Sequence, residues 1–201
     1  MTPDLIQTLD VLDDEQLEYV LKELDQRTFE PATIFNGEGR TTVDENVRSN
    51  SRCSLPEESE AALIMHDAVN AALLDYKDKL VEIHKNFNGF PVPGGWHTTC
   101  WREAFQVLKY EHQQKYEWHC DTSAYPSDAA YHRTISVVLY LQNAEEGGRT
   151  IFPHRAYKPK AGQALIFPSN WCFPHRGEEV LKGRKIAAVT WYHCFYNYDQ
   201  N

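Results

Sequence analysis

The chain has 201 residues, of which 42% are hydrophobic, and a formal net charge of -9. This length fits one domain with a substantial buried core, so we expect a single domain over residues 1–201. The negative charge argues against a nucleic-acid-binding surface, because phosphates bind to basic faces.

The sequence predicts a cytoplasmic protein. Its first 16 residues, MTPDLIQTLDVLDDEQ, have neither the basic nor the apolar stretch of a signal peptide. No apolar run approaches the ~20 residues that a membrane span requires. An odd number of cysteines with no CxxC pair fits reduced thiols better than a disulfide framework. These cysteines are Cys53, Cys100, Cys120, Cys172 and Cys194.

Two helices are predicted in the first half of the chain. Residues 12–26 (LDDEQLEYVLKELDQ) carry apolar residues at helical spacing and acids at the start, and residues 57–84 repeat the apolar spacing over several turns. Between them we expect a strand over residues 28–35 and a polar loop over residues 37–54. Residues 86–96, rich in Gly and Pro, end the helical part.

After Trp101 the sequence changes to short strand-like runs separated by turns such as NAEEGG and KPKAG. Helices followed by many strands favour a β core with helices packed against it. We therefore expect helical support over about residues 1–100 and a β core over about residues 101–198. The candidate strands are residues 104–110, 115–121, 133–142, 149–153, 163–168 and 185–195.

The stretch KYEWHCDTS contains a candidate pair of metal ligands. Alternation along a strand puts His119 and Asp121 on the same face. A neutral imidazole and a carboxylate at one point are two ligands of a site that lacks a third. An HxD motif alone is weak, and most other histidines are expected to be solvated or packed. This ordinary reading applies to His66, His84, His97, His112 and His154.

His175, 54 residues after Asp121, is the candidate third ligand. Two imidazoles and one carboxylate form the facial triad of non-haem Fe(II) oxygenases, which leaves the opposite face of the metal open. Lys185 follows ten residues later, at the start of the core-like run KIAAVTWYH. A buried lysine there needs an anionic partner, which the distal carboxylate of a dicarboxylate co-substrate would supply. The alternative is a solvated lysine in the basic turn LKGRK.

Residues 105–193 resemble the 2-oxoglutarate- and Fe(II)-dependent prolyl 4-hydroxylases, in a minimal microbial or viral form. The matching blocks, in order, are QVLKYEHQQKYEWHCD, HRTISVVLYLQNAEEGGRTIFP, KPKAGQALIFP and HRGEEVLKGRKIAAVTWYH. The resemblance implies a mainly β fold with flanking helices, built on a double-stranded β-helix of the jelly-roll kind. It also implies hydroxylation of prolyl residues in a peptide or protein, with release of succinate and CO₂. Fe(II), 2-oxoglutarate and O₂ would be required, and ascorbate is a family-level expectation.

The resemblance carries roles to individual residues by position. It implies that His119, Asp121 and His175 bind the iron and form the catalytic centre. Lys185 would pair with the 5-carboxylate of 2-oxoglutarate, and Tyr110 would line the co-substrate pocket.

Four further positions match those that hold the proline substrate in the family: Tyr116, Arg133, Trp191 and His193. An arginine can donate two hydrogen bonds to peptide carbonyls, and aromatic faces suit a proline ring. Taken singly, Tyr116 or Trp191 is better read as part of a packed core. The four together at matching offsets favour a substrate pocket.

The sequence departs from the family pattern at three places. Gln113-Gln114 stands where Gly-Gln is common, Arg149 replaces an acid in GGxT, and Ser136 replaces a threonine. These changes spare the expected metal ligands and bear on peptide preference.

Two other functions stay open from the sequence. One is the same oxygenase chemistry on a free amino acid or other small molecule, with TSAYPSDAAYH (residues 122–132) closing as a lid. The other is a non-catalytic binding barrel or metal-storage protein, which would not need Lys185. Neither a nucleic-acid nor a membrane partner is expected, and the sequence does not define the oligomeric state.

Overall fold

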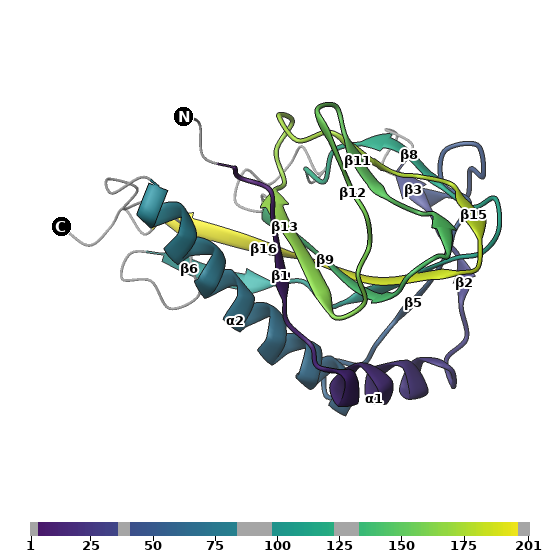
Figure 1. Ribbon diagram of the computed structural model, residues 1–201, viewed down its shortest axis with the longest axis horizontal. Helices are drawn as coiled ribbons and strands as arrows, with labels where there is room; N and C mark the ends of the chain where they lie inside the picture. Colours follow the sequence, from purple (N-terminus) through teal and green to yellow (C-terminus); the bar gives the residue numbers. More distant parts are fainter. Residues whose placement is uncertain (1–3, 36–40, 84–97, 123–132, 197–201) are drawn as a thin grey trace.

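The computed structural model describes residues 4–35, 41–83, 98–122 and 133–196. Two helices, α1 (Asp14–Leu24) and α2 (Glu60–Ile83), lie on one face of a large antiparallel sheet (Figure 1). Helix α1 begins with a capping box, in which the Asp13 side chain accepts from the Gln16 amide and the Gln16 side chain accepts from the Asp13 amide. Among the described residues, no helix combines the length and apolar character needed to cross a lipid bilayer.

The large sheet has the strand order β1-β13-β9-β16-β7-β5-β2, and β6 also pairs with β16. All pairings between the described strands are antiparallel. The bounds of these strands are β1 (Gln7–Asp10), β2 (Glu30–Pro31), β5 (Ser51–Ser54), β6 (Thr98–Arg102), β7 (Gln106–Tyr110), β9 (Arg133–Gln142), β13 (Gln163–Pro168) and β16 (Lys185–Tyr196).

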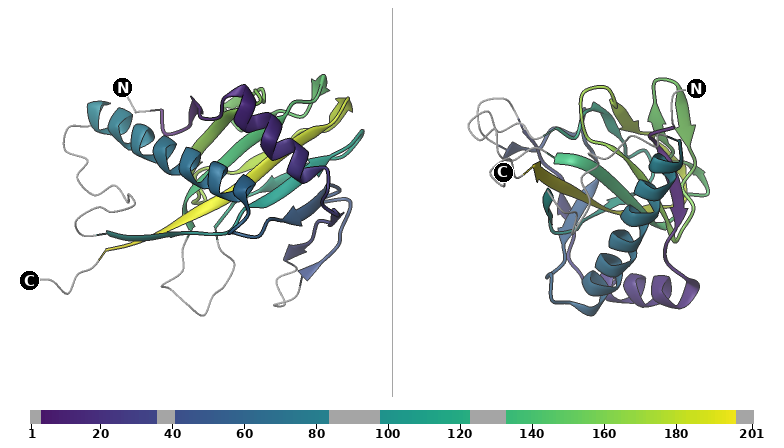
Figure 2. Two further views of the ribbon diagram at one scale, coloured as in Figure 1. Left: turned by 90° about the horizontal axis from the view of Figure 1, so that it is seen from below. Right: turned by 90° about the vertical axis from the view of Figure 1, so that its left-hand side faces the viewer.

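A smaller four-stranded sheet, in the order β12-β11-β14-β8, lies across from the large one (Figures 1 and 2). Two short ribbons, β3-β4 and β10-β15, complete the described strands. Their bounds are β3 (Ile34–Phe35), β4 (Thr41–Thr42), β8 (Tyr116–His119), β10 (Glu146–Gly147), β11 (Thr150–Phe152), β12 (Arg155–Tyr157), β14 (His175–Gly177) and β15 (Val180–Lys182).

The central strands of the large sheet are buried on both faces, which explains their nearly continuous apolar sequence. On β9, Val137 and Leu139 pack with the helices, while Val138 and Tyr140 point into the space between the two sheets. Two separate cores result, one under the helices and one between the sheets. The second core surrounds the cavity described below.

The fold expected from the sequence, a mainly β double-stranded β-helix with flanking helices, is confirmed. Strands β9 and β13 coincide with the predicted ranges 133–142 and 163–168. Besides the two helices, the first hundred residues contribute strands to the large sheet, because β1 pairs with β13 and β5 pairs with β7. Strand β5 lies in the range expected to be a loop.

Candidate active site

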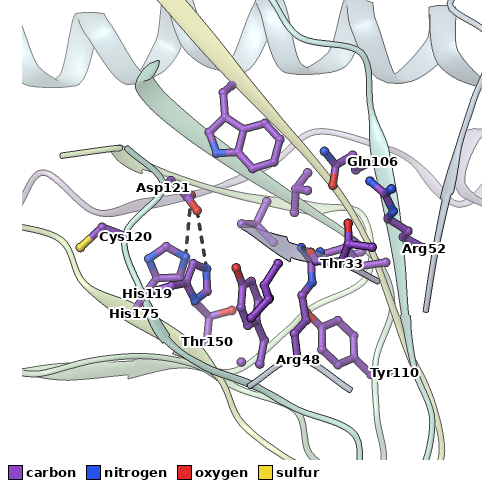
Figure 3. Close-up of a pocket in the computed structure, with 18 of the residues that line it drawn as sticks. Thr33, Arg48, Arg52, Gln106, Tyr110, His119, Cys120, Asp121, Thr150 and His175 are labelled. Carbon is purple, nitrogen blue, oxygen red and sulfur yellow. Dashed lines mark hydrogen bonds and ion pairs between the residues drawn. The ribbon is translucent and has the colours of Figure 1, made fainter. Parts of the chain in front are cut away.

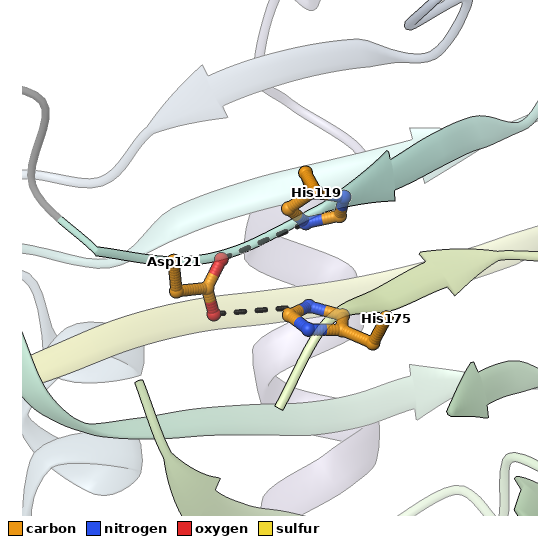
Figure 4. A group of neighbouring side chains, drawn as sticks. All are labelled: His119, Asp121 and His175. Atoms are coloured by element: carbon orange, nitrogen blue, oxygen red, sulfur yellow. Dashed lines mark ion pairs between the residues drawn. The ribbon is translucent and has the colours of Figure 1, made fainter. Parts of the chain in front are cut away.

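The pairing of β8 with β14 brings two of the predicted metal ligands together. His119 and His175 are cross-strand partners in this antiparallel pair, and their ring centroids are 4.3 Å apart. Both side chains lie on the face of the small sheet that is turned toward the large sheet (Figure 4). Two residues separated by 56 positions in the sequence therefore become neighbours through strand pairing.

Asp121, just beyond the end of β8, completes the group. Its Oδ1 lies 3.6 Å from His119 Nε2 and its Oδ2 lies 3.8 Å from His175 Nε2 (Figure 4). These separations are shorter than twice a typical metal–ligand bond of about 2.1 Å, so one ion can contact all three side chains. The structure thus brings the three predicted ligands to one point.

Hydrogen bonds hold both imidazoles in the orientation that metal binding requires. His119 Nδ1 lies 2.8 Å from the Glu117 carbonyl oxygen, and His175 Nδ1 lies 3.1 Å from the Phe173 carbonyl oxygen. A carbonyl only accepts, so each Nδ1 carries the proton and each Nε2 presents a lone pair. This arrangement is typical of metal-binding histidines, and the residues therefore fit a divalent metal such as Fe(II).

The electrostatics of the group favour the same protonation states. Burial and the neighbouring His175 together lower the pKa of His119 to about 4, which the charge of Asp121 only partly opposes. Burial raises the pKa of Asp121, but the two imidazoles and hydrogen bonds from Ser136 and Trp191 hold it below its usual range. Ser136 Oγ donates to Asp121 Oδ2 over 2.7 Å. Near neutral pH the group therefore offers a neutral imidazole at His119 and a carboxylate at Asp121.

The three side chains line one end of a cavity of about 320 Å³ between the sheets (Figure 3). Six of the predicted site residues besides the triad were expected around it, and five line it: Tyr110, Tyr116, Arg133, Lys185 and Trp191. The sixth, His193, is not among the lining residues. The predicted lid, TSAYPSDAAYH, lies almost wholly outside the described residues.

Lys185 is buried in the wall of this cavity, with 3% of its surface exposed. Its Nζ lies 5.1 Å from the centre of the Tyr110 ring and 5.5 Å from that of Tyr140. Burial lowers its pKa to about 8, which the charge of Glu178 only partly opposes. In the described part of the chain no carboxylate lies within salt-bridge distance of Lys185, so its charge is available to an anion in the cavity.

Tyr110 is the cross-strand partner of Lys185 on β7. Burial raises the pKa of Tyr110 to about 12, so the phenol stays protonated and can donate a hydrogen bond. Tyr140 is also held protonated, since burial raises its pKa, and its hydroxyl lies 2.7 Å from Thr150 Oγ1. Neutral hydroxyl groups thus surround the lysine.

Tyr116 lies between the metal group and a buried arginine. The Tyr116 ring stacks on His119 with centroids 3.6 Å apart. The Arg48 guanidinium lies 4.5 Å from the centre of the Tyr116 ring. Arg48 donates from Nε to Asn50 Oδ1 and from Nη1 to the Thr33 carbonyl. Tyr116 therefore orients His119 as well as lining the cavity.

Arg133 uses much of its hydrogen-bonding capacity within the protein. Its Nε and Nη2 donate to the two carboxylate oxygens of Glu103 at 2.6 and 2.7 Å. The guanidinium carbon lies 3.5 Å from the centre of the Trp191 ring. Arg133 Nη1 lies 3.5 Å from the carbonyl oxygen of Asp121, a long contact. Its role as a donor to a substrate stays a prediction.

His193 contacts the same glutamate from the other side. Its Nε2 lies 2.7 Å from Glu103 Oε1, and its ring stacks on Trp101 with centroids 4.2 Å apart. Burial raises the pKa of Glu103, but hydrogen bonds from His193 and Arg133 hold it below its usual range. His193 and Arg133 are thus joined through one carboxylate, which the sequence analysis did not identify.

Sequence analysis also missed two arginines of the cavity wall, Arg48 and Arg52. Both lie in the polar stretch that was expected to be a loop. A run of polar residues carries no local pattern that shows which side chains face a cavity. Their positions follow only from tertiary pairing: β5 pairs with β7 at Arg52, and an isolated β-bridge joins Arg48 to Tyr116.

Comparisons with known proteins agree with this geometry. A profile described as the 2OG-Fe(II) oxygenase superfamily matches residues 105–193. Prolyl 4-hydroxylase 2 of Arabidopsis thaliana is 34% identical over 124 residues, covering 45% of this chain and 41% of that protein. Probable prolyl 4-hydroxylase 10 of the same plant is 28% identical over 211 residues, covering 88% of this chain and 64% of that protein. The chain therefore spans less than two thirds of the length of either relative.

The fold has a close counterpart among solved structures. A viral collagen prolyl hydroxylase from Paramecium bursaria Chlorella virus-1, solved with 2-oxoglutarate, superposes with a TM-score of 0.68 at 20% identity. The superposition covers 94% of this chain and 96% of that one. The strand core of this protein, residues 105–193, is thus similar to the 2OG-Fe(II) oxygenase superfamily, and the chain is related in sequence to the prolyl 4-hydroxylases.

Proposed function

We propose that this protein is an Fe(II)- and 2-oxoglutarate-dependent oxygenase that hydroxylates prolyl residues in a peptide or protein. Succinate and CO₂ would be the co-products. The observation that carries the proposal is a cavity that joins the metal-binding group to a buried lysine, which has no acidic partner among the described residues. The names of the related proteins support proline as the target.

His119, Asp121 and His175 would hold the metal. Bound Fe(II) would supply O₂ activation, coupled to the oxidative decarboxylation of 2-oxoglutarate. The protein orients these ligands in advance, because the two Nδ1 atoms bond to backbone carbonyls and Asp121 accepts from Ser136.

Lys185 would bind the distal carboxylate of 2-oxoglutarate. Its charge has no carboxylate partner within salt-bridge distance in the described chain, and the Tyr110 hydroxyl is kept as a donor by its raised pKa. Val138, Ala187 and Val189 form an apolar part of the wall. They exclude water and so strengthen the attraction between the lysine and a carboxylate.

The target proline would lie between Tyr116 and Trp191, close to the metal group. Tyr116 stacks on His119, and Trp191 hydrogen bonds to Asp121, so both aromatic side chains lie beside the ligands. Aromatic faces bind a proline ring well. Arg133, held over Trp191 by Glu103, borders the same space.

The test is mass spectrometry of short proline-rich peptides incubated with protein, Fe(II), 2-oxoglutarate and O₂. Succinate is measured in the same reactions. His175→Ala removes a ligand, and His112→Ala removes an exposed histidine outside the cavity as the matched control. We expect one added oxygen on proline and an equal amount of succinate with wild type and His112→Ala, and neither with His175→Ala.

Formation of succinate without oxidation of any peptide would refute prolyl hydroxylation and favour a small molecule as the substrate. Absence of both products in metal-loaded protein would refute the oxygenase proposal. Two further expectations accompany the proposal: stimulation by ascorbate, which the family resemblance implies, and a cytoplasmic location, which the sequence predicts. Each is tested directly, by omitting ascorbate from the reaction and by fractionating cells.

A further inference from the structure

The cavity has more positive charge than the proposed reaction uses. Arg48, Arg52, Arg133 and Lys185 line it, whereas Asp121 is the only acidic residue among its described lining residues. This contrasts with the net charge of -9 of the whole chain. Lys185 would bind 2-oxoglutarate, and Arg133 is paired with Glu103. Two arginines are left without a role.

Arg52 lies on β5, opposite Leu108 of β7 in the antiparallel pair. Leu108 belongs to the core between the two sheets, and cross-strand partners point to the same face, so Arg52 is directed toward the cavity. Figure 3 places Arg52 beside Gln106, on the side of the cavity away from the metal-binding group.

Among the described residues, none pairs with the guanidinium of Arg52. Within the part of the chain that the structure describes, no hydrogen bond or salt bridge engages it, and the side chain is only half buried. A guanidinium offers two parallel donors that match a carboxylate. A free guanidinium on the wall of a binding cavity is therefore suited to an anionic group of the bound molecule.

Arg48 adds a second positive charge to the same wall. It is 9% exposed and is fixed by Asn50, Thr33 and the face of Tyr116, none of which carries a negative charge at neutral pH. A buried charge without a counter-ion is unfavourable, and an anion nearby relieves that cost. Both arginines therefore favour negative charge at this end of the cavity.

We infer that the peptide substrate carries an Asp or Glu side chain close to the target residue, and that Arg52 binds it with support from Arg48. This inference rests on the proposed function and specifies its substrate class. A cavity of 320 Å³ is about 9 Å across if roughly spherical, and an extended chain advances about 3.3 Å per residue. The acidic residue thus lies within about three positions of the target.

The test uses fluorescent proline peptides in matched pairs, with Asp, Asn or Lys at each position from three before to three after the target. Binding is measured by fluorescence anisotropy on protein loaded with Fe(II) and 2-oxoglutarate under nitrogen, where no turnover occurs. Oxidation of the same peptides is then followed in air by mass spectrometry. The variants are Arg52→Gln and Arg52→Glu, with Arg155→Gln, an exposed arginine outside the cavity, as control.

Wild type and Arg155→Gln are expected to bind the best Asp peptide about tenfold more tightly than its Asn counterpart, as for a charge-assisted hydrogen bond. Arg52→Gln should reduce this ratio to less than twofold. Arg52→Glu should prefer the Lys peptide, a gain that an unfolded variant cannot produce.

The inference would be overturned by the lack of an Asp preference in wild type, by an unchanged preference in Arg52→Gln, or by a preference limited to peptides with a free C-terminal carboxylate. A weaker affinity for 2-oxoglutarate in Arg52→Gln, with peptide selectivity intact, would also overturn it. Failure of the proposed function would give a different result. If the protein binds Asp peptides selectively but oxidises no proline, prolyl hydroxylation is refuted and the inference about Arg52 is not.

Discussion

His119 and His175 face each other across the β8–β14 pair, with their Nε2 atoms 3.6 and 3.8 Å from the two oxygens of Asp121. Side chains alternate along a strand, so a slip of one residue in this pairing would turn one imidazole to the outer face. The pairing also places Gly177 opposite Tyr116. The register of two short strands thus determines whether the metal site exists.

Ser136 is expected to increase metal affinity through its hydrogen bond to Asp121. Ser136→Ala removes the donor to Asp121 Oδ2 and should lower the affinity for Fe(II) by about 10-fold to 100-fold, the usual effect of losing such a partner. Titration of the apoprotein with Fe(II) under nitrogen measures this. Ser136→Thr keeps the hydroxyl and should bind within about threefold of wild type. Equal affinity of all three proteins would show that the hydrogen bond is unimportant.

Lys185 is expected to lower the stability of the apoprotein and to increase its affinity for 2-oxoglutarate. Burial lowers the pKa of Lys185 to about 8. At pH 7 the charged lysine therefore destabilises the folded apoprotein by a free energy of the order of 3 kcal/mol. Lys185→Met should therefore increase the free energy of unfolding of the apoprotein, measured with urea at pH 7. The same change should raise the KM for 2-oxoglutarate more than 100-fold, since a charge-assisted contact in a dry site is lost.

The control for this variant is Lys160→Met, at an exposed lysine that pairs with Asp10. It should change neither the KM for 2-oxoglutarate nor the stability appreciably, because exposed ion pairs contribute little. A Lys185→Met protein that is less stable than wild type would contradict the expected cost of the buried charge.

The pH dependence of 2-oxoglutarate use should follow the same lysine. Lys185 is protonated in the free enzyme below its pKa of about 8 and neutral above it. The kcat/KM for 2-oxoglutarate is therefore expected to fall above about pH 8, approaching tenfold per pH unit. Lys185→Arg, which stays charged, should not show this decline, whatever its absolute activity. A wild-type profile that is flat to pH 9.5 would contradict this assignment.

The apoprotein's stability should change in the opposite direction over this range. The folded state releases the Lys185 proton near pH 8, whereas the unfolded chain holds it until about pH 10.4. Between these values the unfolded state binds more protons, so this lysine makes stability rise with pH. The difference between wild type and Lys185→Met in urea unfolding at pH 7 and pH 9.5 isolates the effect.

Gln113 has a backbone φ of 65°, in the left-handed region that favours glycine. A residue with a side chain is strained by about 1–2 kcal/mol in this region, and glycine removes that strain. Part of the benefit is lost, because glycine also increases the conformational entropy of the unfolded chain. Gln113→Gly should thus stabilise the protein by about 0.5–1 kcal/mol. Urea unfolding measures this, and Gln114→Gly, next to it in the turn, should not stabilise. A destabilised Gln113→Gly variant would show that its side chain contributes more than the strain.

Much of the fold and the metal site follows from local sequence patterns. The central strands β9 and β13 agree with their predicted ranges because burial on both faces requires uninterrupted apolar runs. The spacing of His119 and Asp121 places them on one face of any strand, and Lys185 begins a core strand where a charge is unusual. These features depend only on alternation and burial, so the sequence carries them directly.

Tertiary structure alone decided which distant residues share the cavity. Arg48 and Arg52 lie in a polar stretch with no pattern that predicts their surroundings, and pairing with Tyr116 and with β7 brings them to the wall. The same is true of Arg133, whose main partner, Glu103, is 30 residues away. Local patterns report which face of an element is buried, whereas the partner of a charged side chain depends on long-range pairing, which this chain acquires only on folding.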